Sequence, residues 1–243
     1  MSGPPAEGAA PPGAAGEEEA SRWVRGMFGR VAHRYDLLNH LLSFNLDRTW
    51  RARTVRELRA ALETPGARVL DLCCGTGDLL VARGGLGVDF CHPMLVQARR
   101  KRPHAALVEA DALALPLADR SLDVAATAFG FRNLANYEKG LREIQRVLKP
   151  GGMAAILEFS QPPSALFAAL YRFYSRRILP AVGGAVSGER GAYEYLPESV
   201  RKFPSAERLA DMMGEAGFVE VRFERLTGGI VALHLGRAGE VTS

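Results

Sequence analysis

The sequence predicts an α/β fold with a doubly wound, mostly parallel sheet. Short apolar segments typical of strands alternate with helical stretches through the middle of the chain, as in parallel sheets with helices on both faces. A glycine-bearing loop directly follows the first of these strands. The length of 243 residues and the 47% share of hydrophobic residues fit one domain with a sizeable core.

The N-terminal region divides into a polar tail and a helical layer. Residues 1–20 are rich in Pro, Gly, Ala and Glu, with too few large apolar groups to offset the entropy of ordering. We expect a disordered tail there. Residues 21–64 carry apolar residues at helical spacing, interrupted at 43–47, and this pattern predicts a helical lid that contains a loop.

Residues 65–160 are expected to form the core of the sheet. Apolar segments predict five strands, at 68–72, 86–90, 106–109, 122–128 and 153–159. Helices are expected near 92–102 and 136–148, followed by a Lys149-Pro150-Gly151-Gly152 turn. Only residues 78–85 separate the glycine loop from the second strand, so the first crossover helix is expected to have one or two turns.

Residues 161–204 are expected to form an insertion on the substrate side, with a long Gly- and Pro-punctuated stretch from 183 onward. Its first part, 164–179, predicts a helix with one apolar face. That face contains Leu166, Phe167, Leu170, Tyr171, Tyr174 and Ile178, with Arg172, Arg176 and Arg177 elsewhere.

Residues 205–237 complete the predicted domain, which spans 21–237. A helix at 205–216 is expected to end at Gly217, and two apolar segments after it predict a hairpin-like strand pair. These two strands bring the predicted sheet to seven. Residues 238–243 are expected to form a short tail.

Charge and cysteine content limit the possible environments. The formal charge is +4, but the first twenty residues hold four glutamates and no base, so the remaining chain carries +8. That excess could attract nucleic acid, anionic lipid or an acidic ligand, and because charge alone does not choose among them, a solvated basic surface is the starting interpretation. No zinc module, recognition helix or single-strand platform is apparent, so we expect no nucleic-acid partner. The three cysteines suggest neither a disulfide framework nor a metal site.

The chain has no apolar run near the roughly 20 residues needed to cross a bilayer, and its N-terminus lacks the features of a signal peptide. We therefore expect a cytoplasmic protein, with peripheral contact at the inner face of the cell membrane as a further expectation. A homodimer is also compatible with the sequence.

The loop Cys73-Cys74-Gly75-Thr76-Gly77-Asp78 is expected to hold a cofactor. It follows the first strand, where ligands bind in open α/β sheets, and its glycines let the backbone approach a ligand. A dinucleotide is the weaker interpretation. Its fingerprint needs a third glycine where Leu80 stands, and an acid about 20 residues after the loop, whereas Asp89 comes sooner.

Two acids at strand ends suit the nucleoside part of such a cofactor. Asp89 can accept hydrogen bonds from two ribose hydroxyls, and Asp111 from an exocyclic amine, with Ala112 leaving room for a ring. The alternatives are a strand-end cap for Asp89 and a helix cap for Asp111. Together with the RVLKPGGMAAILEFSQP segment at 146–162, this arrangement indicates a methyltransferase that uses S-adenosylmethionine.

Motifs over residues 21–237 resemble the ubiquinone/menaquinone biosynthesis C-methyltransferase family. They are YDLLNHLLSFNLDRTWR (35–51), DLCCGTGDL (71–79), GVDFCHPML (87–95), DALALP (111–116), FGFRNL (129–134), RVLKPGG (146–152), LEFSQP (157–162), YEYLPESVRKFP (193–204) and LTGGIVALH (226–234). The glycine loop alone is shared with many methyltransferases, but the first and last motifs together are highly specific.

The resemblance implies a class I S-adenosylmethionine-dependent methyltransferase fold (Rossmann-like) with no metal. It implies methyl transfer to a ring carbon of a reduced polyprenyl quinone precursor, with demethylmenaquinol as the preferred acceptor and a benzoquinol as the alternative. Cofactor positions carry over to Thr76, Asp89, Asp111 and Ala112. The resemblance also implies a cofactor position at Ala128, where Ser is usual. Asp47 stands where His is usual and Cys91 where Ser is usual.

Candidate catalytic residues lie in the loop after the fourth strand and in the lid. Because the nucleophile must be a quinol, whose phenolic pKa is normally about 10, the site has to take or stabilise a proton. Arg132 is expected to stabilise the phenolate or hold a water, and Asn133 to orient the hydroxyl. In the lid, Tyr35, Asp36 and His33 are candidates, with His33 a possible base that is more often structural.

Several alternatives stay open at this point. Glu158 is a candidate anchor for the lid backbone, and the 164–179 helix is a candidate wall for a prenyl groove or simply a helix packed on the sheet. Tyr195 and His234 resemble family positions but are also typical structural residues. The acceptor could instead be another small phenol or lipid, and a non-catalytic partner of a quinone-synthesis complex is the rival of a different class.

Overall fold

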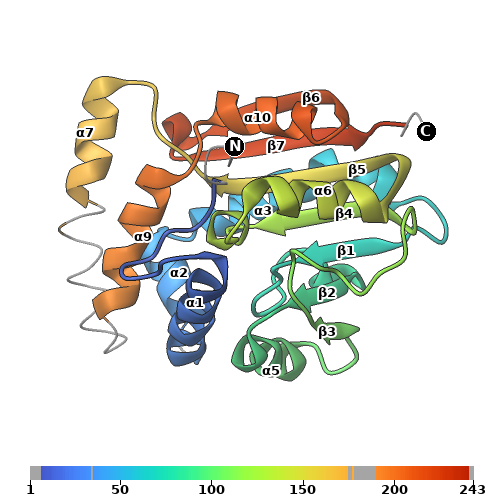
Figure 1. Ribbon diagram of the computed structural model, residues 1–243, viewed down its shortest axis with the longest axis horizontal. Coiled ribbons are helices and arrows are strands. Elements are labelled where there is room, and N and C mark those ends of the chain that lie inside the picture. The colour runs from blue at the N-terminus through green and yellow to red at the C-terminus, as the bar shows by residue number, and fades with distance from the viewer. Residues whose placement is uncertain (1–6, 34, 175–176, 178–189, 241–243) are drawn as a thin grey trace.

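The computed structural model describes residues 7–33, 35–174, 177 and 190–240, and it contains the expected seven-stranded sheet (Figure 1). The strands are β1 (Val69–Leu72), β2 (Leu86–Asp89), β3 (Leu107–Glu109), β4 (Leu122–Ala128), β5 (Leu148–Phe159), β6 (Phe218–Leu226) and β7 (Val231–Ala238). Their order is β3-β2-β1-β4-β5-β7-β6. The first five strands pair in parallel, and β7 pairs antiparallel with both β5 and β6. The mostly parallel sheet and the terminal strand pair are therefore confirmed.

Helices cover the sheet and its carboxyl edge. They are α1 (Glu17–Val31), α2 (Tyr35–Leu42), α3 (Leu46–Glu57), α4 (Arg59–Leu62), α5 (His92–Lys101), α6 (Tyr137–Val147), α7 (Ala165–Phe173), α9 (Arg190–Lys202) and α10 (Ala206–Glu215). In Figure 1 the arrows of β1, β4 and β5 point toward α1, α2, α7 and α9, so the expected lid and insertion lie at the ligand-binding edge.

Apolar side chains from the helices cover both faces of the sheet. This is expected because the strands have apolar residues at nearly every position. On one face α6 contributes Leu141, Ile144 and Val147 to the largest core cluster. On the other, Trp50 of α3 and Leu58 pack with residues of β4, β5 and β7. Within the described residues no helix is both long and apolar enough to span a bilayer.

The N-terminal tail is shorter than expected. Helix α1 begins at Glu17, and Ala20 is buried in the largest core cluster. The segment before it follows the loop and helix after β4, where the Ala9 amide donates to the Leu134 carbonyl and the Tyr137 amide donates to the Glu7 carbonyl, both at 2.8 Å. These backbone partners lie far away in sequence, so composition alone did not reveal them. Residues 1–6 of the predicted tail lie outside the described residues.

The first crossover lacks the expected α-helix. Only a 3-10 turn, η1 (Val81–Arg83), stands between the glycine loop and β2. The Asp71 carboxylate, on β1, accepts hydrogen bonds from the Leu80 and Val81 amides at 2.8 and 3.0 Å. Eight residues are too few for a stable crossover helix. The first amides of any helical turn lack partners within that turn, and here the Asp71 carboxylate accepts from them.

Two further boundaries differ from the predictions. Strand β5 starts at Leu148 and not at 153, because the 149–152 turn bulges out between pairs Leu122–Leu148 and Val124–Met153. The Gly- and Pro-punctuated stretch of the insertion contains helix α9, with Pro197 inside it, a helix for which no prediction was made. The predicted positions Arg176, Ile178 and 178–189 lie outside the described residues.

The C-terminal tail is also shorter than expected, because β7 continues to Ala238. The Phe218–Ala238 and Val219–Arg237 pairs with β6 hold this end of the strand. Residues 241–243 lie outside the described part of the chain.

Candidate functional site

A pocket opens at the carboxyl ends of β1, β2 and β4, and we call it the strand-end pocket. It contains about 650 Å³ of space, part of which is open to solvent. Its lining includes Ser21, Phe28, Tyr35, Cys73, Gly75, Asp89, Phe90, Asp111, Ala112, Ala128, Phe129, Gly130, Asn133 and Leu134. Five of the seven predicted cofactor residues are thus brought together here, namely Gly75, Asp89, Asp111, Ala112 and Ala128.

Asp89 fixes the shape of this pocket. Its carboxylate accepts hydrogen bonds from the Gly75 amide at 2.8 Å and from the Cys91 amide at 2.9 Å. Burial raises the pKa of Asp89 to about 6 although these amides oppose that shift. Each carboxylate oxygen keeps a further lone pair. Asp89 therefore caps the loops, as the alternative interpretation held, and still offers acceptors to a ligand.

The other strand-end acid also combines both interpretations. Asp111 lines the pocket, and its carboxylate accepts a hydrogen bond from the Leu113 amide at 2.9 Å. Asp111 is exposed while Ala112 is buried, so the acid lies at the open side and the alanine in the wall.

Two predicted cofactor residues are outside the pocket lining. Thr76 is buried and its hydroxyl donates to the Asp36 carboxylate at 2.5 Å. Gly77 has φ +79°, and a Cβ there would lie 3.1 Å from a methyl of Val81. Both residues shape the loop in this structure. The motif could not distinguish loop-shaping residues from lining residues, because they alternate along the same short turn.

The strand-end pocket fits a nucleoside cofactor with an amino-acid end. Gly75, at φ +54°, keeps the loop in a conformation that other residues rarely adopt. At Gly130, a Cβ would lie only 2.3 Å from the Cβ of Cys73, so this part of the pocket wall has no room for a side chain. The buried Nδ2 of Asn133 lacks a hydrogen-bond partner among the described residues and lines this pocket. An unpaired buried donor beside two carboxylates suits a polar ligand.

A second, larger cavity adjoins the first, and we call it the aromatic cavity. It has a mainly apolar wall and contains about 1700 Å³ of space, part of which is open to solvent. Lining residues from the lid include Met27, Val31, Asn39, Leu42, Phe44 and Trp50, and those from the insertion include Phe167, Tyr171, Phe173, Tyr174, Tyr195 and Leu196. Phe28, Tyr35 and Phe129 line both spaces. The two spaces therefore meet at these three rings.

A buried ion pair stands in the wall of the aromatic cavity. Arg132 donates from Nη1 to Glu158 Oε1 at 2.9 Å and to the Phe129 carbonyl at 2.6 Å, and its amide donates to Glu158 Oε2 at 3.1 Å. Its guanidinium lies 5.3 Å from the centre of the Phe159 ring. Burial lowers the pKa of Arg132 and the Glu158 carboxylate raises it, with a net increase. Arg132 thus remains charged and is held in place.

Glu158 does not anchor the lid backbone. Besides Arg132, its carboxylate accepts a hydrogen bond from the Phe159 amide, at 2.8 Å. The strand β5 ends beside the loop after β4, so the acid holds that loop rather than a helix across the cavity.

Asn133 and two tyrosines lie near this pair. The Tyr195 hydroxyl donates to the Asn133 side-chain oxygen at 3.3 Å, and the Tyr195 ring packs on Trp23 with centres 4.9 Å apart. Burial raises the pKa of Tyr195 to about 12 and also raises that of Tyr35. Both tyrosines therefore stay protonated and act as hydrogen-bond donors at neutral pH.

Three candidate residues, namely His33, Asp36 and His234, line neither the strand-end pocket nor the aromatic cavity. His33 is exposed and lines neither space, because it belongs to the turn that ends α1. Asp36 also lines neither space. His234 is buried in β7, with Nε2 at 2.8 Å from the Ala206 carbonyl, and burial lowers its pKa to about 4. We therefore assign His33 and His234 no place in the site.

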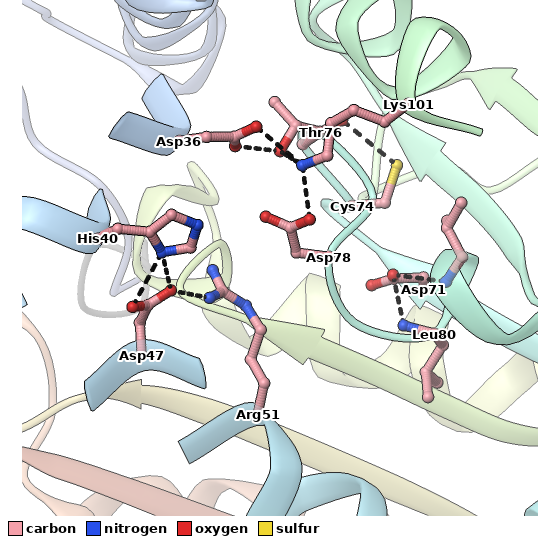
Figure 2. Close-up of polar contacts among 12 residues, drawn as sticks. Asp36, His40, Asp47, Arg51, Asp71, Cys74, Thr76, Asp78, Leu80 and Lys101 are labelled. Carbon is pink, nitrogen blue, oxygen red and sulfur yellow. Dashed lines mark hydrogen bonds and ion pairs between the residues drawn. The ribbon is translucent and has the colours of Figure 1, made fainter. Parts of the chain in front are cut away.

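Asp36 instead joins the lid to the glycine loop (Figure 2). Lys101, the last residue of α5, donates to the Asp36 carboxylate at 2.8 Å, to the Asp78 carboxylate at 2.5 Å and to the Thr76 hydroxyl at 3.2 Å. The sequence analysis missed Lys101. A lysine at the end of a helix is ordinarily explained by its interaction with the helix dipole. Only the position of this helix end beside the carboxyl ends of the strands could have indicated that Lys101 contacts the glycine loop.

No group of three or more His, Cys, Asp or Glu residues in the described ranges is arranged to hold a metal ion.

Comparison with known proteins identifies the family. Residues 15–238 match the model of the ubiE/COQ5 methyltransferase family. A demethylmenaquinone methyltransferase of Thermus thermophilus is 52% identical over 221 residues, covering 86% of this chain and 99% of that protein. A ubiquinone/menaquinone biosynthesis C-methyltransferase UbiE of Syntrophotalea carbinolica is 46% identical, covering 88% of this chain and 93% of that protein.

A solved structure supports the fold. A SAM-dependent methyltransferase of Thermotoga maritima, described as a possible histamine N-methyltransferase, aligns with a TM-score of 0.65 at 22% identity and covers 88% of this chain and 99% of its own. Likeness at that identity concerns the fold alone, and it confirms the class I S-adenosylmethionine-dependent methyltransferase fold. Since the family model spans most of the sequence and relatives share up to about half of its residues, the chain belongs to the ubiE/COQ5 methyltransferase family.

Proposed function

We propose that the protein transfers a methyl group from S-adenosylmethionine to a ring carbon of a reduced polyprenyl quinone precursor, with demethylmenaquinol as acceptor and menaquinol as product. The observation that carries the proposal is the contact between the two spaces at Phe28, Tyr35 and Phe129. One space is lined by the carboxylates of Asp89 and Asp111, and the other is larger and mainly apolar. The name and similarity of the Thermus thermophilus relative support the same acceptor.

In this proposal the strand-end pocket binds the cofactor, which supplies an electrophilic methyl group on a sulfonium sulfur. Asp89 accepts hydrogen bonds from ribose hydroxyls, Asp111 accepts from the adenine amine, and Ala112 packs beside the ring. Gly75 and Ala128 leave space along the wall. Thr76 and Gly77 act indirectly, by keeping the glycine loop in its shape.

The catalytic residues of the proposal lie on both sides of the junction: Tyr35 lines both spaces, Asn133 lines the strand-end pocket and Arg132 lines the aromatic cavity. Loss of the phenolic proton makes the neighbouring ring carbon nucleophilic, and the Arg132 guanidinium stabilises the resulting oxyanion. Arg132 stays charged and is a poor base, so the proton leaves to water. Asn133 and Tyr35 donate hydrogen bonds that orient the acceptor. The ring carbon then forms its bond to the methyl carbon as the methyl–sulfur bond breaks, and its own hydrogen leaves as a proton.

The aromatic cavity is proposed to hold the prenyl tail at a membrane surface. Phe44 and Phe173 line the cavity and yet are 74% and 61% exposed, so apolar rings surround its mouth. Leu166, on the predicted apolar face of this helix, is 83% exposed and extends this apolar surface along α7. A cytoplasmic enzyme with such a rim can take up a lipid acceptor at the inner face of the membrane. Homodimer formation stays a prediction.

A benzoquinol is the second candidate acceptor, because the Syntrophotalea carbinolica relative is named for both quinone pathways. The test is transfer of labelled methyl from S-adenosylmethionine to chemically reduced demethylmenaquinol and, in parallel, to a reduced benzoquinol precursor and a water-soluble phenol, all in detergent. Product from the naphthoquinol alone supports the proposed acceptor, and product from both quinols supports a dual-use enzyme. Product from the phenol alone, or cofactor binding without any product, contradicts the proposal.

A further inference from the structure

A third space lies outside the two already described, and we call it the basic hollow. It lies between α3 and the segment after the glycine loop and contains about 860 Å³ of space, part of which is open to solvent. Its lining residues are His40, Arg48, Arg51, Ala52, Val55, Asp78, Leu79 and Arg83. Arg51 is the only one that also lines the aromatic cavity. Three arginines therefore converge on one opening.

The shortened first crossover accounts for the position of one of these arginines. With only η1 in place of a helix, Leu79 and Leu80 lie in the core with Trp50 and Leu58 of the α3 region. Arg83 follows at the end of the turn and is exposed. The segment opposite α3 is therefore a single short turn, whereas a longer helix would place more side chains in this space.

The charges of the hollow are not balanced. Its only acidic lining residue, Asp78, is already paired with Lys101 at 2.5 Å. Arg51 is paired with Asp47, which also accepts from His40 at 2.9 Å, as Figure 2 shows. The guanidinium groups of Arg48 and Arg83 form no ion pair or hydrogen bond with any residue that the structure describes; their backbone amides donate to the Asn45 and Leu80 carbonyls.

We propose that the basic hollow binds a phosphate-type anion between Arg48 and Arg83. Guanidinium groups match phosphate oxygens in geometry, and two unpaired ones facing a common space create a local positive potential that an anion relieves. Arg51, held by Asp47 and lying 5.4 Å from the centre of the Phe129 ring, forms the back of the site. The anion thus binds beside the substrate cavity and not in it.

Two sources share this chemistry, namely a free phosphate and the headgroup of an anionic lipid. Next to His40, the exposed side chains of Leu37, Leu41 and Phe44 would place the hollow at headgroup level if they entered a bilayer. That source rests on the membrane contact in the proposed function. The anion site itself does not, since binding requires neither a quinol nor methyl transfer.

The test compares the R48Q/R83Q variant with a charge-matched control, R56Q/R100Q. Arg56 and Arg100 are exposed on α3 and α5 and lie outside the hollow. Inorganic phosphate is titrated calorimetrically at constant ionic strength set with chloride. Binding of vesicles that contain phosphatidylglycerol is measured by sedimentation against pure phosphatidylcholine vesicles. S-adenosylmethionine affinity and melting temperature confirm that both variants fold.

We expect the control to match the wild type and the hollow variant to bind about tenfold more weakly, a difference that two lost charge-assisted contacts readily produce. Loss of phosphate binding assigns the site to a free anion, and loss of phosphatidylglycerol vesicle binding alone assigns it to a lipid headgroup. The proposal is overturned if the hollow variant and the control bind both probes equally, or if the wild type binds neither. Each outcome is independent of methyl transfer, so failure here leaves the proposed function standing.

Discussion

The strand-end pocket and the aromatic cavity are held in shape in different ways. Backbone amides bonded to buried carboxylates fix the first, as in the Gly75–Asp89 contact at 2.8 Å. Side chains from helices far apart in the sequence form the second, and its rim includes exposed rings such as Phe44 and Phe173. The difference suggests that cofactor binding depends on a few fixed loops, whereas acceptor binding depends on how α2, α7 and α9 pack. Arg132 lines the aromatic cavity and does not line the strand-end pocket.

The largest effect is expected for Arg132→Ala. It removes the proposed oxyanion partner and leaves Glu158 buried without its cation, so turnover should fall about 10²- to 10³-fold. S-adenosylmethionine affinity should change less than about threefold, since Arg132 does not line the strand-end pocket. Arg225→Ala is the control, because Arg225 pairs with Glu207 away from both spaces. Equal loss of turnover and cofactor affinity would refute the proposed role of Arg132.

Asp89→Asn should produce the converse pattern. Losing the carboxylate removes charge-assisted acceptors for ribose hydroxyls, so cofactor affinity should fall about tenfold or more, by calorimetry. Because the pKa of Asp89 is raised to about 6, wild-type affinity should also weaken as pH falls below that value. Asp123→Asn, which changes an acid outside both spaces, is the control. Unchanged cofactor affinity in Asp89→Asn would contradict the ribose contact.

Asp71 tests whether the shortened crossover relies on its carboxylate. Asp71→Ala leaves two buried amides unpaired and should lower the free energy of unfolding by about 1–3 kcal/mol, measured in urea. Asp71→Asn keeps an oxygen that accepts from both amides and should lose much less. Similar losses in the two variants would contradict the acceptor role, because Asn keeps both the side-chain volume and an accepting oxygen.

The same residue gives a pH dependence with a defined sign. Burial raises the pKa of Asp71 to about 7, against about 3.9 in an unfolded chain. Between these values the folded state binds more protons, so this group stabilises the fold at low pH and the contribution is lost as pH rises toward 7. Stability of the wild type relative to Asp71→Asn should therefore increase as pH falls from 7 to 4. A relative stability that is constant with pH, or decreases as pH falls, would contradict the raised pKa.

The smallest effect is expected at the rim of the aromatic cavity. Phe173→Ser should change stability little because the ring is 61% exposed, yet it should raise the KM for a long-chain quinol about threefold. The KM for an acceptor with a single isoprene unit should not change. Val219→Ser, at a half-exposed position on β6, controls for surface polarity. Equal KM changes for long and short acceptors would argue against a tail-binding rim.

Short sequence patterns predicted those parts of the molecule whose structure depends on neighbouring residues in the chain. The seven strands, the glycine loop and the acids Asp89 and Asp111 could be found because alternation, turn residues and strand ends are visible in a short window. The packing of residues 7–20 could not, since their partners are backbone groups near Leu134 and Tyr137.

The same limit explains the residues that were misplaced or missed. The Asp36–Lys101 contact joins two helices 65 positions apart, so neither residue carried a local signal for it. His33 matched a base by chemistry alone, and the turn after α1 leaves its side chain in solvent. The type of a residue alone therefore predicts a catalytic role poorly until the position of its helix, strand or loop in the fold is known.

The central claim is that a reduced acceptor in the aromatic cavity attacks the methyl group at the junction of the two spaces. The most direct measurement is anaerobic single-turnover transfer of labelled methyl to demethylmenaquinol and to its oxidised quinone, with mass-spectrometric location of the label. The account predicts label on a ring carbon of the reduced acceptor, no product from the quinone, and slow transfer by Arg132→Ala. Equal product from the oxidised quinone, or label on oxygen, would contradict it.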